Sequence, residues 1–173
     1  MRYSRPLLPL VLVLAIAAAA IAQNEAKRGP STPEERQRFV AITHKMEDSP
    51  LDEGLRNERA WALKWLVEIP DISVSVCIAP IDGPSKKKYK YSPELTVQLT
   101  FSSAAFIIEH PDQAKDGDAQ HLAGVEGAIK AYQSILKTKP DAKSKAMDDL
   151  LEKQHDGKLA DYVQETWRAN CTK

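Results

Sequence analysis

The sequence is poor in the residues and spacings that mark common enzymes and metal proteins. It contains only two cysteines and four histidines among 173 residues. It has no Gly-x-Ser-x-Gly motif, no phosphate-binding glycine loop, and neither a His-Glu-x-x-His nor a Cys-x-x-Cys spacing. These absences argue against the hydrolases, nucleotide-binding enzymes and zinc proteins that such motifs define. We therefore expect a non-catalytic protein that uses no cofactor.

Long apolar runs are also missing, apart from one near the start of the chain. Residues 7–21 are apolar except for Pro9. Arg2 and Arg5 precede this run, and Ala22 ends an Ala-x-Ala sequence. A positive start, a short apolar core and small residues at alternate positions are typical of a secretory signal peptide that is cleaved after the last alanine. A membrane-spanning helix needs about 20 apolar residues, so we expect no stable membrane span after cleavage.

These signals divide the chain into a leader region and one domain. We predict a signal peptide over residues 1–22, a flexible leader over 23–31 and a single helical domain over 32–173, in a protein that is periplasmic or secreted. The chain has 24 basic and 24 acidic side chains, and loss of Arg2 and Arg5 leaves 22 against 24, a formal charge of −2. A nucleic-acid-binding protein normally carries a basic surplus, so nucleic acid is not an expected partner.

The two cysteines, Cys77 and Cys171, both lie in the predicted mature chain. Exported proteins meet an oxidising environment in which two thiols tend to pair. We therefore expect one disulfide, which would tie the C-terminal end of the chain back to its middle. In the chain-entropy model the closure of such a long loop contributes about 4 kcal/mol to stability. Two separate thiols are the alternative.

Apolar residues recur at three- and four-residue spacing through most of the predicted mature chain, which is typical of amphipathic helices. Helix-start signals include a capping box at residues 32–35, and helix-stop signals include Pro70 and Gly157. Short connections between helices favour antiparallel neighbours. We predict an all-α bundle of about six helices, over residues 32–46, 50–68, 93–109, 119–137, 140–156 and 159–169.

Residues 71–79 fit this helical pattern less well. Isoleucines and valines alternate here with serine and cysteine, which is the period of a half-buried strand. A strand needs a partner edge, and the other candidate, residues 95–101, continues into an apolar run that is too long for an ordinary strand. The segment therefore stays open between a short strand and a buried crossing that is extended or briefly helical.

The densest group of possible metal ligands surrounds the predicted start of the helix at residue 119. Its two imidazoles and three carboxylates are His110, Asp112, Asp116, Asp118 and His121. Such side chains bind divalent metals or act as general acid and base, although their spacing matches no known metal-binding loop. Helix capping and solvation of a turn are the competing interpretation.

Two further groups are candidates for binding. One is a run of lysines interleaved with tyrosines, namely Lys86, Lys87, Lys88, Tyr89 and Tyr91. Positive charge beside aromatic rings attracts anionic polymers or lipid headgroups, but the run favours a solvated loop whose tyrosines pack on the domain. The other is Trp61, at the edge of an apolar helix face, where an exposed ring could stack on a sugar or on a partner's side chain.

Several short segments of the chain carry a resemblance to a known group of proteins. They are residues 65–68 (Trp-Leu-Val-Glu), 88–92 (Lys-Tyr-Lys-Tyr-Ser), 103–106 (Ser-Ala-Ala-Phe) and 123–127 (Ala-Gly-Val-Glu-Gly). Over about residues 60–171 the chain is similar to an uncharacterised family of small exported bacterial helical proteins that has no assigned activity. The resemblance implies an envelope or secreted setting, and it transfers no catalytic or binding residue.

A partial resemblance to tetratricopeptide repeats covers residues 128–140. Ala128, Tyr132, Ile135 and Pro140 stand at the offsets found in the second helix of such a unit. The preceding residues lack that family's Trp, Leu-Gly and Tyr pattern, and no second copy occurs in the sequence. The match therefore implies an amphipathic helix that proline ends, rather than a repeat array.

The sequence favours an exported helical domain that binds another protein or a component of the cell envelope without changing it chemically. No motif identifies that partner. The alternative function is an exported metal-assisted or acid/base enzyme that uses the region of His110, Asp116, Asp118 and His121. That alternative requires these side chains to converge in the folded protein.

Overall fold

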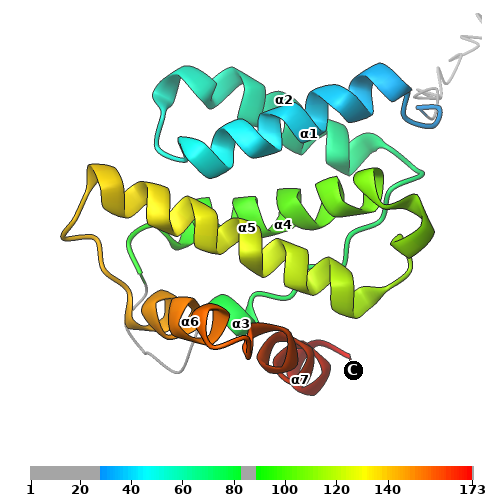
Figure 1. Ribbon diagram of the computed structural model, residues 1–173. Helices are drawn as coiled ribbons and strands as arrows, with labels where there is room; N and C mark the ends of the chain where they lie inside the picture. The colour runs from blue at the N-terminus through cyan, green and yellow to red at the C-terminus, as the bar shows by residue number, and fades with distance from the viewer. Residues whose placement is uncertain (1–27, 83–88, 173) are drawn as a thin grey trace, which may run out of the picture.

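Helices account for all regular secondary structure in the described part of the chain. The computed structural model describes residues 28–82 and 89–172. Within these ranges it contains seven α-helices, two short 3-10 helices and no strand (Figure 1), which confirms the predicted all-α class. The elements are α1 (Pro33–Asp48), η1 (Glu53–Leu55), α2 (Arg56–Glu68), α3 (Ala79–Asp82), α4 (Ser92–Glu109), η2 (Pro111–Gln113), α5 (Gly117–Thr138), α6 (Lys145–His155) and α7 (Leu159–Cys171).

The predicted signal peptide, residues 1–22, and the first part of the predicted leader, residues 23–27, lie outside the described residues. Lys86, Lys87 and Lys88 lie outside them as well. Among the residues that are described, no helix combines the length and the apolar character that crossing a membrane requires.

The start of α1 follows its predicted capping box. The backbone N–H of Glu35 donates to the hydroxyl of Thr32 (3.2 Å), and the Glu35 carboxylate accepts from the backbone N–H of Thr32 (3.1 Å). Pro33 occupies the first helical position, where no intrahelical N–H is needed. The predicted stop at Gly157 is also present: this glycine has φ 70°, the left-handed conformation that ends α6 at little steric cost.

The second predicted helix begins later than its sequence suggests. In place of a helix from Pro50, the chain makes a turn and then the 3-10 helix η1, and α2 begins only at Arg56. The carboxylate of Asp52 accepts from the backbone N–H of Gly54 (2.8 Å) and starts the 3-10 turn. A short polar side chain that caps its own neighbour competes here with α-helix formation.

Residues 70–78 form an extended crossing rather than a strand. Ile72 and Cys77 are buried, whereas Val76 and Ile78 are 48% and 43% exposed, so the buried residues come from both sets of the alternating pattern and burial does not follow the strand period. The only other candidate strand, residues 95–101, belongs to α4. Without a partner edge the crossing makes no sheet, and it leads into the short helix α3.

α4 and α5 pack side by side along the middle of the molecule (Figure 1). Their close approach depends on two glycines of α5. A Cβ atom at Gly124 would lie 2.3 Å from the hydroxyl of Ser103, and one at Gly127 would lie 1.9 Å from the hydroxyl of Ser102. Only glycine leaves room for these serines at the helix contact.

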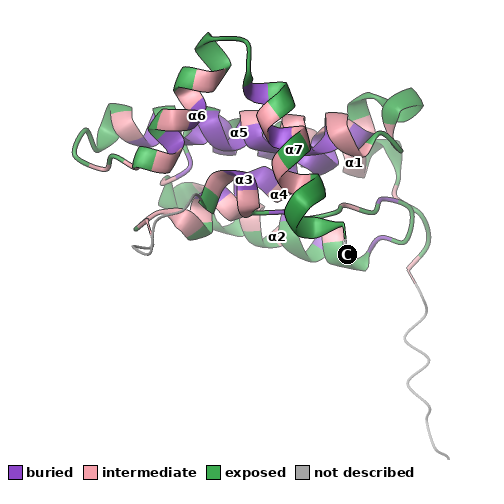
Figure 2. Cartoon of the chain, turned by 90° about the horizontal axis from the view of Figure 1, so that it is seen from below, coloured by how far each residue is buried: buried purple, intermediate pink, exposed green. Residues whose placement is uncertain are grey.

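The helices form three layers, with α1 and α2 on one side of the α4–α5 pair and α3, α6 and α7 on the other (Figure 1). One hydrophobic cluster lies between α1, α2 and α4 around Phe39, Trp65 and Phe101. A second cluster surrounds α5 and includes Tyr132 and Leu150. Figure 2 shows α4 and α5 as the most buried helices, as expected for the layer that both clusters share.

Candidate functional site

A cleft with a volume of about 720 Å³ opens between the start of α4 and the connection from α5 to α6. Residues 89–92 and 139–146 form most of its walls, and Ile81, Asp82 and Thr138 complete the lining. We call it the lysine–tyrosine cleft. Its elements lie at the left edge of Figure 1, where α5 ends and the chain descends to α6. Small-molecule sites in proteins commonly have volumes in this range.

Two tyrosine hydroxyls hold the α5–α6 connection in place. Tyr89 donates its O–H to the carbonyl oxygen of Ala142 (2.8 Å). Tyr132 donates to the carboxylate of Asp148 (2.7 Å) and accepts from the backbone N–H of Ser144 (2.9 Å). Burial, with a further contribution from Asp148, raises the pKa of Tyr132 to about 12. The hydroxyl therefore keeps the proton that it donates.

The lysine–tyrosine cleft carries a surplus of positive charge. Its charged lining residues are Lys90, Lys139, Lys143 and Lys145 against Asp82 and Asp141. The ammonium of Lys145 pairs with Asp149 at 2.8 Å, and that of Lys90 lies 5.2 Å from the centroid of the Tyr91 ring. Because Lys145 is paired with Asp149, the surplus comes from Lys90, Lys139 and Lys143 against Asp82 and Asp141. Like charges around a concave surface focus the electrostatic potential, so this lining favours an anion.

Helix geometry adds to this positive potential. α4 and α6 both begin at the cleft wall, at Ser92 and Lys145. Neither helix start has a hydrogen bond from a capping side chain. The first N–H groups of a helix lack intrahelical partners and carry partial positive charge. In α4, however, the N–H of Ser92 donates to the carbonyl oxygen of Tyr89, that of Leu95 donates to the carbonyl oxygen of Tyr91, and Pro93 has none. The C-terminal end of α5 also reaches the cleft at Thr138, so the helix contribution to anion binding comes mainly from the start of α6.

The lining of the cleft offers several kinds of contact to a ligand. Its described residues include lysines and aspartates, two tyrosine rings, and the hydroxyls of Ser92, Ser144 and Thr138. These groups provide charge, aromatic surface and hydrogen bonds.

The structure brings some of the predicted binding residues to this cleft and adds others. Tyr89 and Tyr91 line it, as half-buried side chains. The sequence did not indicate Lys139, Lys143 and Lys145, which lie about fifty positions further along the chain. The only signal that could have identified them is the alternation of lysines on both sides of Pro140, a pattern that exposed turns also show.

Trp61 is not a free binding surface. The guanidinium of Arg38 lies 3.8 Å from the centroid of its ring, and the ring of Trp65 stacks on it with centroids 5.8 Å apart and an interplanar angle of 19°. Trp65 itself is only 1% exposed and belongs to the core. Trp61 therefore extends the packing of α1 on α2, because a cation–π contact and a stacked ring already engage it.

The five candidate metal ligands do not converge. No group of three or more His, Cys, Asp or Glu side chains within residues 28–82 and 89–172 is placed to hold a metal ion. Asp116 caps α5 by accepting from the backbone N–H of Ala119 (3.1 Å). Asp112 is exposed in η2, and the ring of His110 packs on Phe106 at the end of α4. Asp116 and His110 are therefore engaged by neighbouring residues and not by a shared metal site.

Asp118 and His121, the remaining two, pack against α7. The carboxylate of Asp118 accepts hydrogen bonds from Gln164, Trp167 and Arg168. The ring of His121 is buried against Trp167, with centroids 4.5 Å apart. Burial, partly opposed by Asp118, lowers the pKa of His121. Both side chains therefore join helices, and the arrangement does not support the metal-assisted or acid/base alternative.

A second polar cluster lies where α1, α4 and α5 meet, around a hollow of only about 100 Å³. The carboxylate of Glu47, whose side chain is 9% exposed, accepts from the hydroxyl of Ser102 (3.1 Å), Nδ1 of His44 (3.1 Å) and Nζ of Lys130 (3.3 Å). Nε2 of His44 lies 3.5 Å from the carboxylate of Glu109. The serine is thus bound to a carboxylate rather than activated by the imidazole, and the cluster links three helices.

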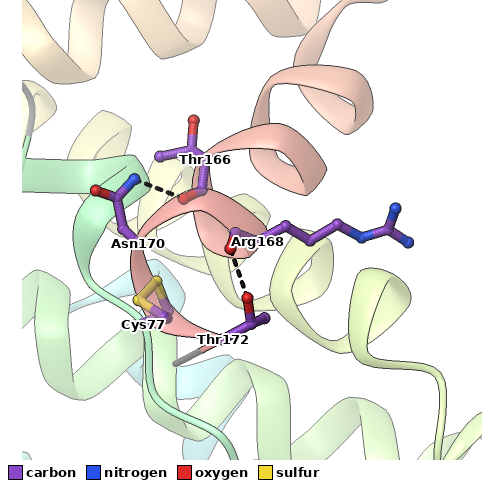
Figure 3. Close-up of a disulfide and its surroundings, with 6 residues drawn as sticks. Cys77, Thr166, Arg168, Asn170 and Thr172 are labelled. Atoms are coloured by element: carbon purple, nitrogen blue, oxygen red, sulfur yellow. Dashed lines mark hydrogen bonds between the residues drawn. A yellow bond between two sulfur atoms is a disulfide. The ribbon is translucent and has the colours of Figure 1, made fainter.

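Cys77 and Cys171 form a disulfide, with sulfur atoms 2.08 Å apart and Cα atoms 6.0 Å apart (Figure 3). The pair joins the extended crossing to the end of α7. Nearby, the side-chain amide of Asn170 donates to the carbonyl oxygen of Thr166 (2.7 Å), and the hydroxyl of Thr172 donates to the carbonyl oxygen of Arg168 (2.6 Å). These bonds satisfy carbonyl groups in the last turns of the helix.

The lysine–tyrosine cleft is the place where concave shape, aromatic rings and surplus positive charge coincide. Among the other candidate residues, Trp61, Asp118 and His121 join helices, and Asp116 caps one. Comparison of the chain with protein-family models, with curated proteins and with solved structures finds no match.

Proposed function

We propose that this protein is an exported, non-catalytic binding protein that holds an anionic ligand in the lysine–tyrosine cleft. The observation that carries the proposal is the charge of the lining, with four lysines, one of them paired with Asp149, against two aspartates around a hollow of about 720 Å³. Ammonium groups bind carboxylates through charge-assisted hydrogen bonds. The tyrosine rings offer apolar surface beside these charges.

The disulfide supports the exported setting, because disulfides persist mainly outside the reducing cytosol. The signal-peptide pattern of residues 1–22 and the resemblance to small exported bacterial proteins point in the same direction. Mass spectrometry of protein recovered from the envelope or medium tests this part. We expect a mature chain that begins at Gln23, and recovery of the uncleaved chain inside the cell would contradict export.

Isothermal titration calorimetry with hexaglutamate, its ends blocked, tests the binding function. The Lys139→Gln/Lys143→Gln variant removes two charges from the cleft. The matched control, Lys64→Gln/Lys115→Gln, removes two charges from exposed positions elsewhere on the surface. We expect the wild type to bind hexaglutamate saturably. The cleft variant should have an affinity at least ten-fold lower, about 1.4 kcal/mol, and the affinity of the control should stay within two-fold of the wild type.

Salt provides a second readout, since exposed charge pairs are screened as ionic strength rises. Wild-type affinity for hexaglutamate should fall between 20 and 200 mM salt, and the cleft variant should show a shallower dependence. Absence of saturable binding, or equal weakening in the cleft and control variants, would overturn the proposed function.

A further inference from the structure

A second hollow, of about 360 Å³, adjoins the lysine–tyrosine cleft across the end of α5. It is lined by residues 48–52 of the α1–α2 turn and by Ser134, Thr138 and Lys139. We call it the acidic hollow. In Figure 1 the α1–α2 turn lies above the end of α5 at the left edge, and the α5–α6 connection lies below it.

The two hollows share part of their lining. Thr138 and Lys139 contribute to both, and both residues are exposed to solvent. Thr138 and Lys139 therefore mark the solvent-exposed border of two adjacent hollows. The two hollows together are the candidate groove.

The two parts of the groove have opposite charge. The acidic hollow carries Asp48 and Asp52 against Lys139 alone, whereas lysines predominate in the cleft. Helix dipoles make the acidic hollow more negative still. α1 ends at Asp48 and α5 ends at Thr138, so two helix C-termini with partial negative charge border the acidic hollow. A polymer with only negative groups would be attracted to the cleft and repelled from the hollow.

From this charge pattern we infer that the groove binds an extended peptide segment with acidic side chains at one end and a basic side chain at the other. The inference rests on the proposed function of the cleft. The end of α5 lies between the two hollows, so the peptide must cross the width of one helix, about 10 Å. An extended chain advances about 3.3 Å per residue, and roughly three residues therefore separate the acidic end of the peptide from its basic end. Pro50 and Leu51 provide apolar contact beside the basic end.

Three blocked peptides of equal length test this inference by titration calorimetry on the full mature chain. The bipartite peptide has two glutamates, three glycines and two lysines in that order. The interleaved peptide has the same composition with alternating charges, and hexaglutamate with one added glycine is the purely acidic probe. We expect wild-type protein to bind the bipartite peptide at least ten-fold more tightly than the interleaved one.

The Asp48→Asn/Asp52→Asn variant should abolish this ten-fold preference and leave the affinity for the acidic probe equal or higher. Asparagine at position 52 retains an oxygen that can accept from Gly54, so the turn is preserved. Asp112→Asn/Asp161→Asn, at exposed positions outside the groove, is the matched control and should change neither value. Thermal melting checks that each variant is folded.

The outcomes separate this inference from the function on which it rests. If the acidic probe does not bind, the proposed function fails and the inference fails with it. If the acidic probe binds but wild-type protein does not distinguish the bipartite from the interleaved peptide, the inference alone is overturned. An unchanged preference in the Asp48→Asn/Asp52→Asn variant would also overturn it.

Discussion

The indole N–H of Trp167 donates to a carboxylate oxygen of Asp118 at 2.9 Å and thereby joins α7 to the start of α5. Gln164 and Arg168 donate to the other oxygen of the same carboxylate. The hydrogen bond from Gln164, followed by that from Trp167, holds the pKa of Asp118 below its ordinary value. An aspartate that the sequence offered as a metal ligand is therefore a structural contact between two helices.

Replacing Asp118 by alanine should destabilise the domain without any loss of bound metal. The change removes the acceptor for three donors from α7, and a partly buried donor left without an acceptor costs free energy. Thermal unfolding followed by circular dichroism should show a lower midpoint. Asp112→Ala, at an exposed position, is the control and should melt like the wild type. Stoichiometric metal that disappears in Asp118→Ala would instead revive the metal-site hypothesis.

Loss of the disulfide should lower the free energy of unfolding by about 4 kcal/mol, because it closes a long loop with a sequence separation of 94 residues. Urea unfolding of Cys77→Ser, Cys171→Ser and the double variant measures this. All three should lose about the same amount, since either single change already breaks the bond. A double variant as stable as the wild type would show that the covalent link contributes nothing to stability.

Gly127→Ala should destabilise the contact between α4 and α5. The new methyl group would lie 1.9 Å from the hydroxyl oxygen and 2.4 Å from Cβ of Ser102, and such overpacking typically costs 1–3 kcal/mol, so we expect about 2. Gly29→Ala is the control, because nothing lies within 4 Å of its Cβ position. Ser102→Gly removes the clashing hydroxyl but also its hydrogen bond to Glu47, so both single variants and the double variant are compared in a double-mutant cycle. The double variant should be more stable than the sum of the two single losses predicts, and strict additivity would mean that the clash lies elsewhere.

His44 should make stability depend on pH near neutrality. Burial lowers its pKa, but Glu47 and Glu109 outweigh burial and raise it above the ordinary value. The stabilisation by protonated His44 is therefore fully present below about pH 6.5 and is lost as pH rises through the raised pKa. Lys130 and Glu126 also border this cluster.

Urea unfolding of wild type and His44→Gln at pH 5.5 and pH 8 tests this expectation. The free energy of unfolding of the wild type should exceed that of the variant by about 0.5 kcal/mol more at pH 5.5 than at pH 8. The expected difference is small because the imidazole is half exposed and solvent screens its ion pairs. His155→Gln, whose side chain is 90% exposed, is the control. A larger difference at pH 8 would contradict the assigned direction of the pKa shift. His121 is common to both proteins and cancels in the comparison.

Local signals in the sequence were sufficient to predict the helical class, most helix positions, the cap at Thr32 and the stop at Gly157. Their physical basis is short-range: helix periodicity and capping involve residues three or four positions apart. The pairing of Cys77 with Cys171 was also accessible, because two cysteines allow only one intramolecular disulfide. Where local signals competed, as at Asp52, the predicted helix start was displaced.

The roles of the polar side chains required the tertiary structure. Asp118 looks like a metal ligand in sequence, yet it meets Trp167 only because α7 folds back on α5. Tyr89 and Lys143 become walls of one cleft because the α5–α6 connection returns to the start of α4. Sequence periodicity shows which face of a helix is apolar, but contacts between residues fifty positions apart depend on how the helices pack. The helical class therefore follows from local chemistry, whereas the candidate binding groove follows from long-range packing.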